Sequence, residues 1–199
     1  MEDIDYDLLS VEELNKEVEK GNLYALFNLA LRYQSGDGVE QDINKALDSF
    51  NRVYNDTQDY DLKCYVGAII GEIYLYDEQN RNIDLAVKHL EESAEYGLPN
   101  ARLYLGLYLT GIDYGFDRTE EQLKRGARLL IDLFEESKTE SPDVTGGLSH
   151  YVAVLYANGK GVEKNLIKAK ECAELAIELT DAEASKELLK YINSELTFN

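Results

Sequence analysis

The chain has 199 residues, 44% of them apolar, which is enough to bury one continuous hydrophobic core. Its 39 acidic and 20 basic residues give a formal net charge of −19. This balance argues against nucleic acids and anionic membranes as partners, because both are bound through clusters of lysine and arginine. We therefore expect a single domain, residues 1–199, that binds neither.

The cellular location is predicted from the first residues and from the cysteines. Residues 1–5 are acidic, whereas a secretory signal requires a basic segment followed by an apolar one, and no apolar run reaches membrane-spanning length. Cys64 and Cys172 are far apart, and each lies in a helical pattern, which favours reduced thiols over a disulfide. These features predict a cytoplasmic protein.

The first predicted element is a capping helix over residues 8–20. Ser10 and Glu13 form the Ser-x-x-Glu pattern of a capping box, in which each side chain bonds the backbone N–H group of the other residue. Gly21 ends this helix, and Asn22 caps the next one.

A pattern of about forty residues then repeats along the chain. Its two clearest copies are Ala25, Leu29, Ala30, Tyr33, Gly36, Gly38, Val39, Asp42, Lys45, Ala46 and Leu148, Val152, Ala153, Tyr156, Gly159, Gly161, Val162, Asn165, Lys168, Ala169. The alanine of the second half recurs at intervals of 40 to 42 residues, at Ala46, Ala86, Ala127 and Ala169. This period is typical of two helices per unit, so we expect helix-pair repeats over 22–57, 63–97, 99–138 and 142–180.

The connections inside each unit have recognisable turn chemistry. Gly36 and Gly159 are expected to end the first helix in the left-handed conformation that glycine adopts without strain. The second helices are expected to begin after the capping residues Asp42, Asn82, Thr119 and Asn165. A last capping helix over 181–194 is predicted to open with a capping box from Thr180 to Glu183. No alternating strand pattern is present, which predicts an all-α fold.

Through these residues the chain resembles the Sel-one-like repeat family, a relative of the tetratricopeptide repeats. The resemblance runs over roughly 24–180, with degenerate copies in the middle: the second unit lacks the glycine loop near Asp77, and the third has Leu109 in place of the tyrosine. It implies an α-solenoid, a right-handed superhelix of about four helix pairs with N- and C-terminal capping helices. It also implies a concave surface that binds other proteins.

Catalytic and metal-binding motifs are weak by comparison. Ser149 and His150 are neighbours on one helix and point about 100° apart, so they cannot form a nucleophile–base pair with each other. His89 and His150 are the only histidines, and neither lies at metal-ligand spacing. We expect no catalytic residue, metal, cofactor or small-molecule substrate, although a hydrolase that depends on a carboxylate or on His150 stays open as an alternative.

The resemblance also selects candidate partner-binding residues by analogy with tetratricopeptide geometry. They are Tyr24, Phe27, Leu31, Tyr65, Glu72, Asn100, Leu103, Leu107 and His150. Among them Tyr24, Phe27 and Tyr65 stand out, because aromatic side chains often dominate binding energy. Packing between repeats is the alternative role for these three.

The sequence therefore favours a non-catalytic protein–protein interaction module. Its most specific form is a bacterial immunity-type protein that binds and neutralises a basic toxin or effector through an acidic, aromatic-bearing surface. A net charge of −19 would speed the encounter with such a partner. The alternative is a regulatory adaptor that assembles two cellular proteins.

Overall fold

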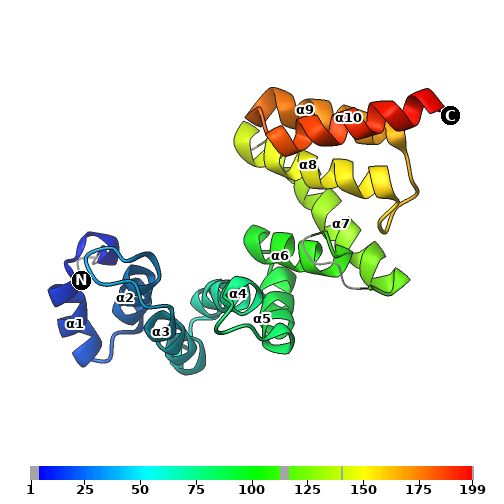
Figure 1. The fold of residues 1–199 in the computed structure, drawn as a ribbon. Coiled ribbons are helices and arrows are strands. Elements are labelled where there is room, and N and C mark those ends of the chain that lie inside the picture. Colours follow the sequence, from blue (N-terminus) through cyan, green and yellow to red (C-terminus); the bar gives the residue numbers. More distant parts are fainter. Residues whose placement is uncertain (1–4, 113–116, 140, 199) are drawn as a thin grey trace. The chain divides into compact units, whose positions relative to one another are not determined.

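The structure, a computed structural model, describes residues 5–112, 117–139 and 141–198 (Figure 1). The described residues form helices and no strand, so the predicted all-α fold is confirmed. The helices are η1 (Tyr6–Leu8), α1 (Val11–Glu19), α2 (Leu23–Ser35), α3 (Ile43–Asp56), α4 (Tyr60–Tyr76), α5 (Ile83–Glu95), α6 (Pro99–Thr110), α7 (Glu120–Ser137), α8 (Pro142–Asn158), α9 (Leu166–Thr180) and α10 (Glu183–Phe198). None of the described helices is both long and apolar enough to cross a membrane.

The chain divides into two compact units, Met1–Ala101 and Arg102–Asn199. Within each unit, helices that follow one another in sequence pack side by side. In the first unit α2 packs on α3 and α4 on α5, and in the second α8 packs on α9 and α9 on α10. The pairs α2–α3, α4–α5 and α8–α9 correspond to predicted repeats, and α10 is the predicted C-terminal capping helix. The single-domain assignment over 1–199 stays a prediction.

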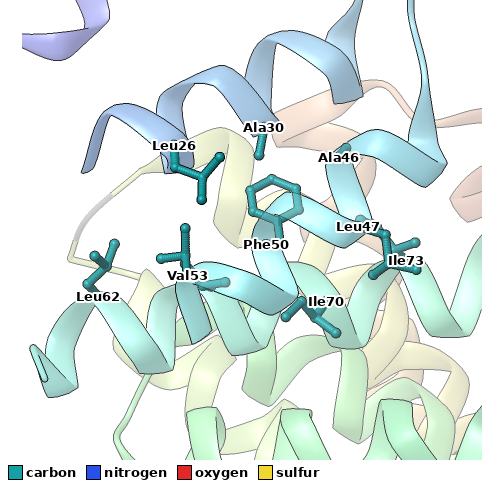
Figure 2. Close-up of a cluster of buried hydrophobic side chains, with 10 residues drawn as sticks. Leu26, Ala30, Ala46, Leu47, Phe50, Val53, Leu62, Ile70 and Ile73 are labelled. Carbon is teal, nitrogen blue, oxygen red and sulfur yellow. The ribbon is translucent and has the colours of Figure 1, made fainter. Parts of the chain in front are cut away.

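The core of the first unit is built around α3, which has α2 on one side and α4 on the other (Figure 2). Phe50 of α3 is fully buried and lies beside Leu26 and Ala30 of α2, with Ile70 of α4 in the same cluster. Removing a large core side chain of this kind costs about 3–5 kcal/mol in typical proteins. The three helices therefore depend on one another for burial.

The core of the second unit is formed by residues of α6 to α10. Its buried residues are Leu107, Ala127, Leu130, Leu133, Phe134, Leu148, Val152, Ala153, Leu155, Ala157, Ala169, Ala173 and Ile192. Small residues allow close approach: a Cβ atom at Gly106 would lie 2.8 Å from Cγ of Leu130. Gly71 has the same role in the first unit, where a Cβ atom would lie 2.6 Å from Cγ of Leu90. Glycine at these two positions therefore lets the paired helix approach closely.

The predicted helix ends are confirmed at most positions. Ser10 and Glu13 form the capping box: the Ser10 N–H donates to Glu13 Oε2 at 2.8 Å, and the Glu13 N–H donates to Ser10 Oγ at 3.3 Å. Gly36 and Gly159 end their helices with φ angles of 77° and 68°. The second helices begin after the predicted caps, Asp42, Asn82, Thr119 and Asn165.

The predicted start and end of the C-terminal capping helix were wrong. The predicted capping box at Thr180 does not form, because α9 continues through Thr180 and its hydroxyl donates to the Ala176 carbonyl at 2.7 Å. Asp181 then turns the chain with a φ of 51°, and α10 runs from Glu183 to Phe198, beyond the predicted end at 194. A threonine inside a last helical turn bonds back to its own helix and is no longer free to cap the next one.

The glycine loop of the last repeat is fixed against the preceding helices of the second unit. The Lys160 ammonium donates to the carbonyls of Gly111 at 3.0 Å and Thr110 at 3.4 Å, which occupies backbone acceptors at the end of α6. Gly161 faces the backbone of Leu123 in α7 so closely that a Cβ atom would overlap the carbonyl group. This loop therefore joins α8 and α9 while touching the two helices before them.

Candidate protein-binding surface

Exposed aromatic rings gather around the start of α4 in the first unit. Four tyrosines there are between 42% and 54% exposed: Tyr24, Tyr60, Tyr65 and Tyr96. Phe27 joins them to the core, since its ring centroid lies 6.0 Å from that of Tyr65 and 6.0 Å from that of buried Phe50. Tyr60 and Tyr96 meet edge to face at 5.6 Å. Exposed rings on a fixed base are typical of binding surfaces.

Two aspartates in the first turn of α4 bind these tyrosines. Asp59 caps the helix by accepting from the Leu62 N–H at 3.1 Å, and its other carboxylate oxygen accepts from the Tyr24 hydroxyl. Asp61 accepts from the Tyr96 hydroxyl at 2.5 Å. We call these residues the tyrosine–aspartate surface: Tyr24, Phe27, Asp59, Tyr60, Asp61, Tyr65 and Tyr96.

The hydrogen bonds fix the protonation of this surface. The bond to Asp59 raises the pKa of Tyr24, and the bond to Asp61 raises the pKa of Tyr96. The same bond from Tyr24 lowers the pKa of Asp59. A bond to the Cys64 thiol raises the pKa of Tyr60. At neutral pH the surface therefore presents neutral phenols beside an ionised aspartate.

The predicted partner-binding residues of the first unit fall into two groups. Tyr24, Phe27 and Tyr65 lie on the surface just described. Leu31 is half-buried and packs against the core of the first unit. Glu72 is half-buried on α4, and Asn100 is exposed at the start of α6. The role of Glu72 and Asn100 in binding stays a prediction.

The predicted residues of the second unit are less available to a partner. The prediction that Leu107 binds a partner was wrong. Leu107 is buried with Ala127, Leu130 and Leu155, because this side of α6 faces the core of the unit. Leu103 is half-buried against the same cluster. His150 is half-buried, and its Nδ1 atom lies 2.9 Å from the Ser185 hydroxyl.

Sequence reasoning missed Asp59, Asp61, Tyr60 and Tyr96 as members of the surface. It started the second repeat at residue 63, whereas α4 begins at Tyr60 and Asp59 is its N-cap. The Asp-x-x-Leu spacing at Asp59 was a usable signal for an N-cap. The tyrosine bonds had no local signal, because each joins residues 35 positions apart.

Catalytic chemistry finds little support in the described residues. The serine in the His150–Ser185 pair is fully buried, so its hydroxyl cannot reach a substrate in this conformation. Within the described ranges no group of three or more histidine, cysteine, aspartate or glutamate side chains could hold a metal ion.

The two histidines predict how stability depends on pH. His89 is buried between the rings of Tyr54 and Tyr74, its Nδ1 atom has no hydrogen-bond partner, and burial lowers its pKa. Burial also lowers the pKa of His150. Both histidines bind a proton more readily when the chain is unfolded, so stability is complete above the unfolded pKa of about 6.5 and falls as pH decreases below it.

Urea unfolding at about pH 7.5 and about pH 5.5 checks this prediction. We expect a lower free energy of unfolding at the acidic pH, and a smaller difference between the two pH values in the His89→Phe variant. The carboxylates whose pKa is lowered, such as Asp42 and Glu136, titrate below this range. Equal stability at the two pH values, or an unchanged difference in the variant, would show that His89 does not resist protonation.

Comparison with known proteins supports the repeat assignment. Residues 23–48, 66–97 and 149–181 match the family model described as Sel1 repeat. The degenerate third unit is not among the matched segments. No curated protein matches the chain.

Solved structures share the fold. A protective antigen present in uropathogenic Escherichia coli strains, displaying an SLR fold, aligns with a TM-score of 0.70 at 21% identity, over 94% of this chain and 37% of its own. A Sel1 repeat protein from Oxalobacter formigenes aligns with a TM-score of 0.60 at 21% identity, over 89% of this chain and 47% of its own. This chain thus spans less than half the length of either neighbour. The likenesses confirm the predicted solenoid class of fold.

A weaker likeness is found to the immunity protein Pa5087 from Pseudomonas aeruginosa. It has a TM-score of 0.37 and 17% identity, over 91% of this chain and 78% of its own. A TM-score this low carries no argument about function.

Proposed function

Because the chain is a Sel1 repeat protein, we propose that it is a non-catalytic module that binds a basic toxin or effector and neutralises it by occupying its surface. Sel1 repeat proteins mediate protein–protein interactions. Beyond this general role, we propose that the partner is basic and that binding neutralises it.

The tyrosine–aspartate surface is the observation that carries the proposal. Surface tyrosines that stand singly are ordinary. Here Tyr60 contacts Tyr96 and Tyr65 contacts Phe27, and such grouped, half-exposed rings resemble the centre of a protein interface. Tyrosine suits this role because its ring buries a large area while it loses few rotamers on binding. The carboxylates beside the rings give the surface a negative charge.

The charge of the whole chain supports a basic partner. A net charge of −19 attracts a cationic protein over distances beyond contact and repels acidic ones. Because this attraction is screened by salt, the association rate should fall as ionic strength rises. Dissociation should depend instead on the aromatic contacts.

The experiment is a reconstitution with basic effector proteins from the same genome, each expressed with and without this chain. We expect one effector whose toxicity the chain relieves, and a purified complex whose association rate falls as sodium chloride is raised from about 0.05 M to about 0.5 M. If none of these basic proteins forms a complex even at low salt, the proposal fails.

An adaptor is the second candidate, and the division of the chain into two compact units favours it. Each unit has its own core and its own exposed surface, so each could bind a different protein. An adaptor predicts two partners that bind at the same time, whereas neutralisation requires one. Competition between two identified partners therefore distinguishes the candidates.

A further inference from the structure

Elsewhere in the chain, lysine side chains lie over tyrosine rings. The Lys45 ammonium lies 5.4 Å from the Tyr33 ring centroid, and the Lys168 ammonium lies 5.2 Å from that of Tyr156. Many carboxylates are likewise paired, for example Glu12 with Lys16, Glu136 with Arg102 and Asp181 with Lys186. Lysine and arginine side chains thus lie beside rings and carboxylates at these places, although 39 acidic against 20 basic residues leave many carboxylates without an ion pair.

Among the described residues, the tyrosine–aspartate surface has neither kind of contact with a cation. Within the part of the chain that the structure describes, Asp59 and Asp61 make no ion pair with a lysine, arginine or histidine. No described lysine or arginine lies over the rings of Tyr24, Tyr60, Tyr65 or Tyr96. Lys63, the nearest cation in sequence, lies instead over Tyr54, at 4.8 Å. On this surface, carboxylates and tyrosine rings that contact no cation therefore lie next to one another.

We propose that this surface receives arginine side chains from the basic partner, and this inference rests on the proposed function. A guanidinium group would lie against the tyrosine rings and donate hydrogen bonds to Asp59 and Asp61. The tyrosine hydroxyls would give up these acceptors when the arginine binds.

The present hydrogen bonds allow this exchange. Tyr24 and Tyr96 are both exposed, so a displaced hydroxyl can bond to water at little cost. A bond between two ions is stronger than one from a neutral phenol to the same carboxylate. Asp59 can keep its capping bond to the Leu62 N–H while its second oxygen accepts from the arginine. Binding therefore does not require α4 to lose its cap.

Arginine fits this surface better than lysine. Its planar guanidinium can stack on an aromatic ring and bind a carboxylate with two parallel N–H bonds at the same time. A lysine ammonium can approach a ring or a carboxylate, but it has neither a flat face to stack nor a planar pair of donors, and it is more strongly hydrated. The chain already contains an arginine–tyrosine contact of this kind, since the Arg118 guanidinium carbon lies 4.4 Å from the Tyr108 ring centroid.

The test uses the full chain and three fluorescein-labelled peptides of glycine and serine, with arginine, lysine or neutral citrulline at the same three positions. We expect fluorescence anisotropy to give an affinity for the arginine peptide about fivefold above the lysine peptide and about tenfold above the citrulline peptide. Asp61→Asn and Tyr96→Leu should each lower the affinity for the arginine peptide about tenfold.

Two matched variants control for general charge and exposure. Asp84 stands at the second position of α5, as Asp61 does in α4, and Tyr76 has the same 42% exposure as Tyr96. Asp84→Asn and Tyr76→Leu should change the affinity less than about twofold. Equal binding of the arginine and lysine peptides, or equal losses in Asp61→Asn and Asp84→Asn, would overturn the inference in favour of diffuse attraction.

The peptide experiment and the effector reconstitution can fail independently of each other. An effector that forms a complex while the arginine peptide shows no preference would overturn this inference and leave neutralisation standing. Arginine-selective binding at the surface, without any effector complex, would support the inference while the proposed function fails. Circular dichroism of each variant confirms that the helices are intact before either conclusion is drawn.

Discussion

Replacing Gly161 with alanine is expected to destabilise the second unit by about 3 kcal/mol or more. The new Cβ atom would overlap the carbonyl group of Leu123 in α7 and lie 2.9 Å from Cβ of Ala127. Backbone atoms cannot rotate away as a flexible side chain can, so the loop or α7 must move. Movement of the loop would also disturb the bonds from Lys160 to the end of α6.

Gly38→Ala is the matched control for this substitution. Gly38 occupies the corresponding position in the first repeat with nearly the same backbone, φ 72° against 70° for Gly161. Its added Cβ atom would meet only Cγ2 of Val11, at 3.3 Å. Both variants carry the strain of a left-handed alanine, about 1–2 kcal/mol, so the difference between them measures the overlap with α7.

Amide hydrogen exchange gives the stability of each unit separately. We expect faster exchange in α7 and α9 of Gly161→Ala, with α3 and α4 unchanged. Similar losses of stability in the two variants would mean that the loop does not approach α7 as closely as described.

Replacing Tyr24 and Tyr65 together with alanine is expected to weaken binding of the basic partner at least about 100-fold. Both rings are about half exposed; Tyr24 donates to Asp59, and the Tyr65 ring contacts Phe27. Each substitution would remove a large contact area from the middle of the binding surface. Phe27 is left in place, because it packs against Phe50 and its loss would damage the core.

Tyr191→Ala provides the control in the second unit. Tyr191 is 44% exposed on α10, close to the 45% of Tyr24, so a similar ring is removed from a different surface. We expect its effect on affinity, measured by isothermal titration calorimetry, to stay below about threefold. An equal loss in Tyr191→Ala, or retention of affinity in the double variant, would remove the tyrosine–aspartate surface from the binding site.

The helices and their ends could be predicted because their signals are local. Asp42, Asn82 and Asn165 cap helices through hydrogen bonds to backbone groups three residues away, and Gly36 turns the chain through its own φ angle. The forty-residue period adds a long-range pattern that a single sequence still displays. These features need no knowledge of how the helices pack.

The remaining features depend on packing between distant residues. Tyr24 meets Asp59, and Tyr96 meets Asp61, only after α2 and α5 are placed beside α4. Leu107 was assigned to a partner by analogy, yet α6 turns it into the core. For the tyrosines and Leu107 a tertiary contact decided the outcome. Thr180 is the exception, because α9 continues through it and its hydroxyl bonds the Ala176 carbonyl of the same helix.

Amide hydrogen exchange of the full chain, alone and in complex with its basic partner, tests the central claim most directly. The account predicts slower exchange on binding in residues 24–31 and 59–65, where the tyrosine–aspartate surface lies. Slower exchange confined to the second unit, Arg102–Asn199, would contradict it.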